Sequence, residues 1–271
     1  MRQHSSPARS LARLLGSAAV AAMLAAGLGG CQTMSDVTGS IRSRPDATAD
    51  DPRHTAEIYG ERYRANPKDA DAALAYGQAL RVTGQRAQAA AVLEQATITH
   101  PGNKPLLAAY GRALADNGSF QAAFDVLTRA HTPDNPDWRI LSVQGAVLDQ
   151  LGRHDEARGY YASALVIMPD EPSVLSNLGM SYVLSKDLPK AEETLRKAYA
   201  SGRADARVRQ NLGLVVGLQG RFAEAESIVK ADLPPDQAAT NVAYLKQMLS
   251  RKDNPRAGSG KVPMASLNTP N

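Results

Sequence analysis

The chain has 271 residues, a formal net charge of +4, five histidines and a single cysteine. One cysteine excludes an internal disulfide, and no two histidines have metal-ligand spacing on one predicted helix. The first 30 residues carry three arginines and no acidic residue, so the rest of the chain is nearly neutral. The charge therefore gives no support to nucleic-acid binding.

Residues 1–30 have the features of a secretory signal peptide. Three arginines precede an apolar run at residues 14–28, which is shorter than the roughly 20 residues that a membrane-spanning helix needs. The run ends in Leu28-Gly29-Gly30-Cys31, which resembles the bacterial lipobox. That resemblance implies cleavage before Cys31 and attachment of lipid to its thiol. An ordinary cleaved signal followed by an incidental cysteine is the alternative.

The residue after the cysteine bears on the membrane. In bacterial lipoproteins an aspartate there favours retention in the inner membrane, so Gln32 favours the outer membrane, with the protein facing the periplasm. Residues 31–50 comprise the lipidated cysteine and a predicted flexible tether, for which ~20 residues give a reach of about 25 Å. The composition of residues 251–271 predicts a disordered tail.

Small residues then recur with a period of 34 through most of the chain. The glycines of the series are Gly77, Gly111, Gly145, Gly179 and Gly213. The alanines of the series, twelve positions later, are Ala89, Ala123, Ala157, Ala191 and Ala225. A fixed period of this size indicates a repeat array in which each repeat is one stacked supersecondary unit.

Each unit is predicted to be a helix, a tight turn and a second helix. In residues 70–103, apolar positions three and four apart indicate two amphipathic helices, separated by Gly84 and ended by Pro101. The turn glycine recurs except in the fourth unit, where Lys186 predicts an altered turn. The predicted array of residues 51–250 consists of a half unit at 52–67, repeats at 70–103, 104–137, 138–171, 172–205 and 206–239, and a capping helix at 236–250.

The periodic glycine lies within the first helix, where glycine costs about 1 kcal/mol relative to alanine. We expect this cost to be offset by packing, because glycine and the paired alanine allow two helices to approach closely. The large apolar position of the second helix is also periodic, with Leu93, Leu127, Tyr161, Leu195 and Val229. None of these glycines is predicted to belong to a functional site.

This pattern resembles the tetratricopeptide repeat. The resemblance implies an all-α fold, a right-handed superhelix of helix pairs, whose first helices line a concave groove. By the same resemblance, the partner-binding groove includes Gln78, Arg81, Arg112, Asp116, Arg139, Asp149, Asn177, Arg207, Gln210 and Asn211. The fifth unit departs from the pattern, because Arg209 and Asp232 stand at positions that are normally apolar.

The groove residues give hints of binding and none of catalysis. Asn177 and Asn211 occupy equivalent places in adjacent units, where several such proteins use asparagine to bind peptide backbone. Leu74 and Ala75 stand where a carboxylate clamp needs lysine or asparagine, so we do not expect capture of a free C-terminal carboxylate. No nucleophile elbow, phosphate loop or zinc-binding helix motif is present. We therefore expect no enzyme, cofactor, metal or small-molecule substrate.

The layout of the chain resembles the TadD family of Flp/Tad pilus assembly lipoproteins. The lipobox, the half unit, five repeats and the segment Gly220–Leu245 carry the resemblance. It implies an outer-membrane adaptor for type IVc pilus assembly or secretion, with the secretin as the expected protein partner in the groove. The alternative is a lipoprotein adaptor for periplasmic proteases or peptidoglycan hydrolases.

Overall fold

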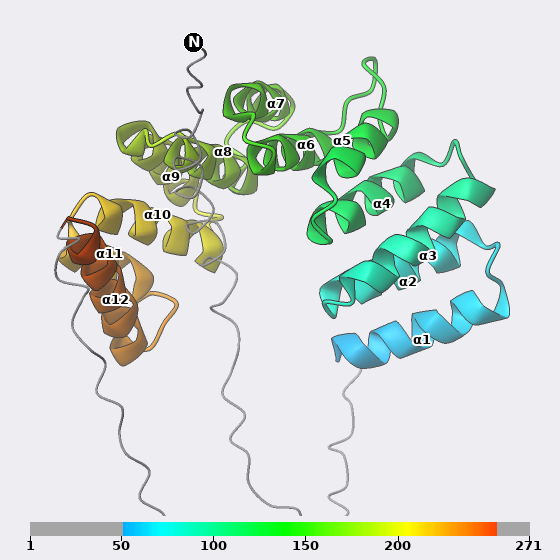
Figure 1. Cartoon of the computed structure of the whole chain (residues 1–271), viewed down its shortest axis with the longest axis horizontal. Coiled ribbons are helices and arrows are strands. Elements are labelled where there is room, and N and C mark those ends of the chain that lie inside the picture. Colours follow the sequence, from blue (N-terminus) through cyan, green and yellow to red (C-terminus); the bar gives the residue numbers. More distant parts are fainter. Residues whose placement is uncertain (1–50, 254–271) are drawn as a thin grey trace, which may run out of the picture. The chain divides into compact units, whose positions relative to one another are not determined.

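The computed structural model describes residues 51–253, in which every regular element is an α-helix (Figure 1). The helices are α1 (Pro52–Ala65), α2 (Ala70–Val82), α3 (Arg86–Thr99), α4 (Lys104–Asp116), α5 (Phe120–Arg129), α6 (Trp138–Gln150), α7 (His154–Ile167), α8 (Pro172–Leu184), α9 (Leu188–Ala200), α10 (Ala206–Leu218), α11 (Phe222–Val229) and α12 (Pro235–Asp253). The predicted signal peptide, Cys31, the tether and residues 254–271 lie outside the described range.

The first helices of the five units begin 34 residues apart, and each begins at a polar cap. The side chain before each helix accepts a hydrogen bond from a first-turn N–H group, which would otherwise lack a partner. These caps are Asp69, Asn103, Asp137, Glu171 and Asp205. They form a further series of period 34, beside those of the helix glycines, the alanines, the turn residues and the large apolar residues.

The turn inside each unit has the same geometry in all five. Gly84 has φ +77°, and its N–H donates to the carbonyl of Arg81 at 3.1 Å. Lys186 has φ +64°, and its N–H donates to the carbonyl of Val183 at 2.9 Å. The prediction of an altered turn in the fourth unit is therefore wrong. The lysine instead adopts the left-handed conformation, which costs a non-glycine residue roughly 1–2 kcal/mol.

Contacts between units differ for the two rows of helices. Each helix packs on the next one along the chain, and α2, α4, α6, α8, α10 and α12 also pack on one another in that order. Within the described chain, the second helices α3, α5, α7, α9 and α11 do not pack on one another to a comparable extent. The first helices thus form one continuous surface, which we call the inner surface.

The periodic glycines pack as the sequence predicts. A Cβ atom on Gly77 would lie 2.5 Å from Cγ of Leu93, and one on Gly213 would lie 2.5 Å from Cγ1 of Val229. Real Cβ contacts are essentially never this short, so only glycine fits between these helices. The five paired alanines are almost completely buried. The side chain that fills the space over each glycine is the large residue sixteen positions later.

The two unusual residues of the fifth unit bind each other. Nε of Arg209 donates to Oδ2 of Asp232 at 2.6 Å, and a second guanidinium nitrogen donates to Oδ1. The hydrogen bonds from Arg209 lower the pKa of Asp232, although burial opposes this effect. The corresponding residues of the fourth unit, Leu175 and Ala198, are buried and apolar. The departure from the pattern is therefore a matched polar replacement of an apolar pair.

Candidate partner-binding surface

Three of the predicted groove residues line one hollow on the inner surface. Gln78 on α2, Arg112 on α4 and Arg139 on α6 border a cavity of about 400 Å³. The remaining wall comprises Leu74, Lys104, Pro105, Ala108, Ala130, His131, Thr132, Asn135, Asp137 and Ile140. The hollow is thus lined by predicted groove residues from three neighbouring first helices, together with the N-cap Asp137 and the first residues of α4.

Arg112 is the half-buried cation of this hollow. Burial lowers the pKa of Arg112, and so does the positive charge of Arg81, while Asp137 acts in the opposite direction. Within residues 51–253 its guanidinium makes no ion pair or side-chain hydrogen bond. A partly desolvated cation without a partner is unfavourable in the free protein, and an arriving anion would relieve that cost.

The nearby charges are mostly occupied. Nε of Arg81 donates to Oδ2 of Asp116 at 2.6 Å, which joins α2 to α4 and pairs two predicted groove residues with each other. The guanidinium of Arg139 lies 4.5 Å from the centroid of the Trp138 ring. Nζ of Lys104 donates to a backbone carbonyl at 2.6 Å. These contacts fix the positions of the cations around Arg112.

The loop after α5 forms a wall of the hollow that the repeat pattern does not indicate. The second helix of the second unit ends at Arg129, and residues 130–137 then lead to α6. His131 and Asn135 of this loop line the hollow, and Nδ1 of His131 is buried without a hydrogen-bond partner in the described chain. The signal was present as Pro133 and Pro136, because prolines three apart disfavour a continued helix.

Asp149 is a buried structural residue, in contrast to its predicted place in the groove. Its Oδ1 accepts a hydrogen bond from Ser181 at 2.8 Å and lies 2.9 Å from Nδ1 of His154. Its Oδ2 accepts a hydrogen bond from Tyr161 at 2.9 Å. Burial, with the charge of Asp149, raises the pKa of Tyr161, so its hydroxyl remains a donor. The carboxylate is satisfied inside the stack and is closed to a partner.

The two equivalent asparagines link neighbouring units. Nδ2 of Asn177 donates to Oγ of Ser142 at 3.1 Å, and Nδ2 of Asn211 donates to Oγ of Ser176 at 2.9 Å. Both asparagines are partly exposed on the inner surface, and both serines are buried. Contact of these asparagines with a partner stays a prediction.

The predicted groove residues Arg207 and Gln210 lie on α10. Both are exposed, and neither lines the hollow. They therefore offer positions on the inner surface at which a partner can be tested independently of the Arg112 hollow.

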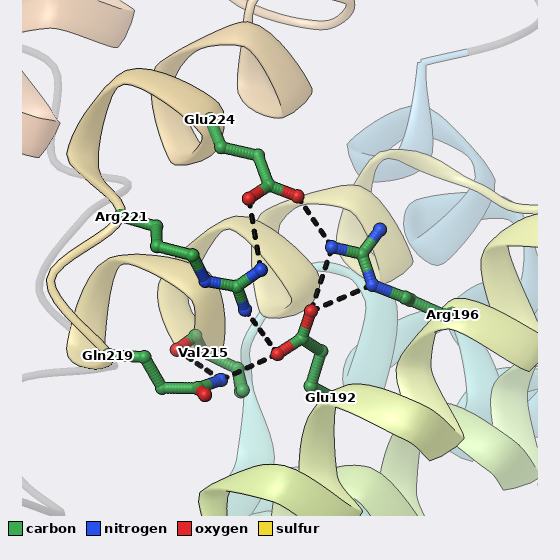
Figure 2. Close-up of polar contacts among 6 residues, drawn as sticks. All are labelled: Glu192, Arg196, Val215, Gln219, Arg221 and Glu224. Carbon is green, nitrogen blue, oxygen red and sulfur yellow. Dashed lines mark hydrogen bonds and ion pairs between the residues drawn. The ribbon is translucent and has the colours of Figure 1, made fainter.

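A second polar cluster joins α9, α10 and α11 (Figure 2). Glu192 accepts hydrogen bonds from Arg196 at 2.8 Å, from Gln219 at 2.8 Å and from Arg221. Glu224 pairs with the same two arginines, at 2.5 Å and 3.0 Å. Burial raises the pKa of Glu192, but the three hydrogen bonds outweigh it and lower the pKa overall. These charges satisfy one another, so the cluster ties two units together.

Clusters of metal-binding side chains and membrane-spanning helices are both absent from residues 51–253. In the part of the chain that the structure describes, no three His, Cys, Asp or Glu side chains are arranged to hold a metal ion. None of the described helices is both long and apolar enough to cross a bilayer.

The stacked helix pairs, the close-packed glycines and the continuous inner surface define a tetratricopeptide-repeat solenoid. Proteins of this class are generally non-catalytic scaffolds that bind protein partners. The profile of a family described as anaphase-promoting complex, cyclosome, subunit 3 matches residues 53–130. The BBSome complex member BBS4 of Bos taurus is 24% identical over 155 residues, covering 57% of this chain. This chain spans only 30% of the length of that relative.

Solved structures share the fold. PilW, described as a widely conserved type IV pilus biogenesis factor, aligns with a TM-score of 0.62 at 18% identity over 71% of this chain and 91% of its own. The Cut9–Hcn1 hetero-tetramer of the APC/C gives 0.61 at 18% identity over 76% of this chain and 41% of its own. A tetratricopeptide protein of Thermus thermophilus gives 0.58 at 20% identity over 66% of this chain and 100% of its own.

Proposed function

We propose that this protein is an outer-membrane lipoprotein adaptor for Flp/Tad pilus assembly, and that its inner surface binds the secretin. The observation that carries the binding function is the hollow around Arg112, where polar residues of three first helices meet and where Arg112 has no ion-pair partner among residues 51–253. The resemblance of Gly220–Leu245 to the TadD family supports the pilus system. PilW, named as a pilus biogenesis factor, has the same fold.

The proposed mechanism combines a membrane anchor with a binding surface. Lipid on Cys31 holds the protein at the membrane, and the tether lets the repeat array reach a neighbouring complex. Linking a binding module to the membrane raises the effective concentration of any partner held there. The adaptor then acts by holding the secretin where its multimers assemble, without a chemical step.

The role of the lipid anchor is tested by substituting Cys31, the residue that would carry the lipid. In cells that make Flp/Tad pili, Cys31→Ser should reduce secretin multimers at the outer membrane and reduce surface pili. Ser35→Ala, in the predicted tether, is the matched control and should leave both unchanged. Secretin multimers and pili that are unchanged in amount and location in Cys31→Ser cells would show that the mechanism is wrong.

The binding surface is tested by photo-crosslinking in the same cells. A photoreactive residue at Gln78 or Gln210 samples the inner surface, and one at exposed Gln95 on α3 samples a second helix. The secretin should be attached from the first two positions and not from the third. Attachment of a periplasmic protease or peptidoglycan hydrolase in place of the secretin would favour the alternative adaptor function.

A further inference from the structure

The wall of the Arg112 hollow has an excess of positive charge. Lys104, Arg112 and Arg139 contribute three cations, and Asp137 contributes the one carboxylate. One oxygen of Asp137 already accepts the backbone N–H of Arg139 at 2.7 Å, which caps α6. Asp116, the other carboxylate near Arg112, is held by Arg81 on the neighbouring helix. The local carboxylates therefore leave the guanidinium of Arg112 with free donors.

The donors of Arg112 suit one class of ligand. A guanidinium presents a planar fork of N–H groups that matches the two oxygens of a carboxylate, and such charge-assisted hydrogen bonds are roughly twice as strong as neutral ones. Neutral polar groups of Gln78 and Asn135 line the same wall and can donate to an oxygen at its margin. The chemistry of the wall thus fits an anion with two oxygens in one plane.

The size and floor of the hollow favour an anion that is part of a peptide. A cavity of about 400 Å³ is far larger than one small ion, since a water molecule occupies about 30 Å³. Half-buried Leu74 and exposed Pro105 supply the accessible apolar part of the lining, whereas Ala108 and Ile140 are almost completely buried. A free anion would leave Leu74 and Pro105 exposed, whereas a segment with an acidic residue beside an apolar one would also cover these two side chains.

We infer that the hollow binds the side-chain carboxylate of an aspartate or glutamate in an extended segment of the protein partner, with an apolar neighbour of that residue over Leu74 and Pro105. This inference rests on the proposed adaptor function and adds the chemistry by which the partner is recognised. It concerns an acidic side chain within a segment and not the free C-terminal carboxylate, for which Leu74 and Ala75 lack the required groups.

Peptide selection on the full-length protein in detergent tests the inference. Random 12-residue peptides displayed on phage are enriched on the protein, and the winners are synthesised with amidated C-termini for anisotropy measurements. The winners should carry an aspartate or glutamate next to an apolar residue. Replacing that acid by its amide, or Arg112→Gln in the protein, should weaken binding about ten-fold or more, because a charged hydrogen bond is lost.

Two controls separate binding from structure. Arg86→Gln removes the same charge from an exposed site on the second helix α3, outside the hollow, and should leave peptide affinity within about two-fold of the wild type. Arg112→Gln should also keep or raise the thermal midpoint of the free protein, because it removes a half-buried cation that makes no ion pair within the described part of the chain. A lowered midpoint would identify Arg112 as a structural residue and overturn the inference.

The remaining outcomes distinguish the inference from the function on which it rests. Selected peptides without acidic residues, an absence of any enriched peptide, or complete displacement by inorganic phosphate or succinate would each overturn the inference. Secretin crosslinked from Gln210 in the same cells would leave the adaptor function standing, since Gln210 does not line the hollow. Absence of secretin crosslinking from Gln210, in a protein with no other substitution, would instead contradict the adaptor function.

Discussion

Replacing Gly145 by alanine tests the close approach of α6 and α7. A Cβ atom at this position would lie 2.6 Å from Cε1 and 2.8 Å from Cζ of Tyr161. Carbon atoms pack best at about 3.5–4.0 Å, so the overlap is about 1 Å. The ring has little freedom to move, because it is buried and its hydroxyl donates to Asp149.

The expected loss of stability follows from three effects. Overpacking of a core costs about 1–3 kcal/mol. Displacing the ring weakens a buried hydrogen bond whose loss costs about 1–3 kcal/mol. Alanine returns about 1 kcal/mol of helix propensity. Together these predict that Gly145→Ala lowers the free energy of unfolding by about 1–5 kcal/mol.

Urea unfolding measures this change locally, because Trp138 is the single tryptophan of the chain and begins α6. Its fluorescence reports the third unit, and circular dichroism reports the array. Gly159→Ala on α7 is the matched control: no atom lies within 4 Å of the added Cβ, so it should gain about 1 kcal/mol. A Gly145→Ala protein as stable as the wild type would refute the packing argument.

Three further predictions concern the turn and the last unit. Lys186→Gly should raise the free energy of unfolding by about 0.5–1 kcal/mol in urea titrations, since relief of left-handed strain exceeds the added entropy of the unfolded chain. Arg209→Leu should destabilise the fifth unit by leaving Asp232 unpaired, and R209L/D232A should recover most of the loss, which a double-mutant cycle of thermal midpoints measures. The pKa values of Glu192 and Asp232 are lower in the folded protein than in the unfolded chain. The stability that these two carboxylates contribute is therefore complete above the unfolded pKa of about 4 and is lost as the pH falls through the folded pKa. Glu192→Gln should make the urea midpoint depend less on pH in the acid range.

The repeat architecture was predictable because its packing is local and periodic. Gly77 and Leu93 lie on adjacent helices of one unit, so the fixed spacing between the two periodic series in the sequence reports their close approach. The five polar caps have the same period for the same reason. Lys186 broke the pattern of residues but not of backbone, since the turn is held by main-chain hydrogen bonds that lysine also makes.

The site was only partly predictable. Gln78, Arg112 and Arg139 follow from their register on first helices, and the structure brings all three to one hollow. Asp149 has the same register as Arg81 but is buried, because Tyr161 stands in the third unit where other units have an aliphatic residue and draws the carboxylate inward. The register of a residue on its helix does not show which large side chain of the neighbouring helix it faces.

The Arg209–Asp232 pair restricts how the gene for such an array can recombine. An exchange at the boundary of a unit moves both residues together and keeps their charges matched. An exchange inside the last unit, between α10 and α11, would join Arg209 to an alanine or Asp232 to a leucine, leaving one partly buried charge alone. We therefore expect the two helices of the fifth unit to be exchanged together, because each carries one half of the matched pair.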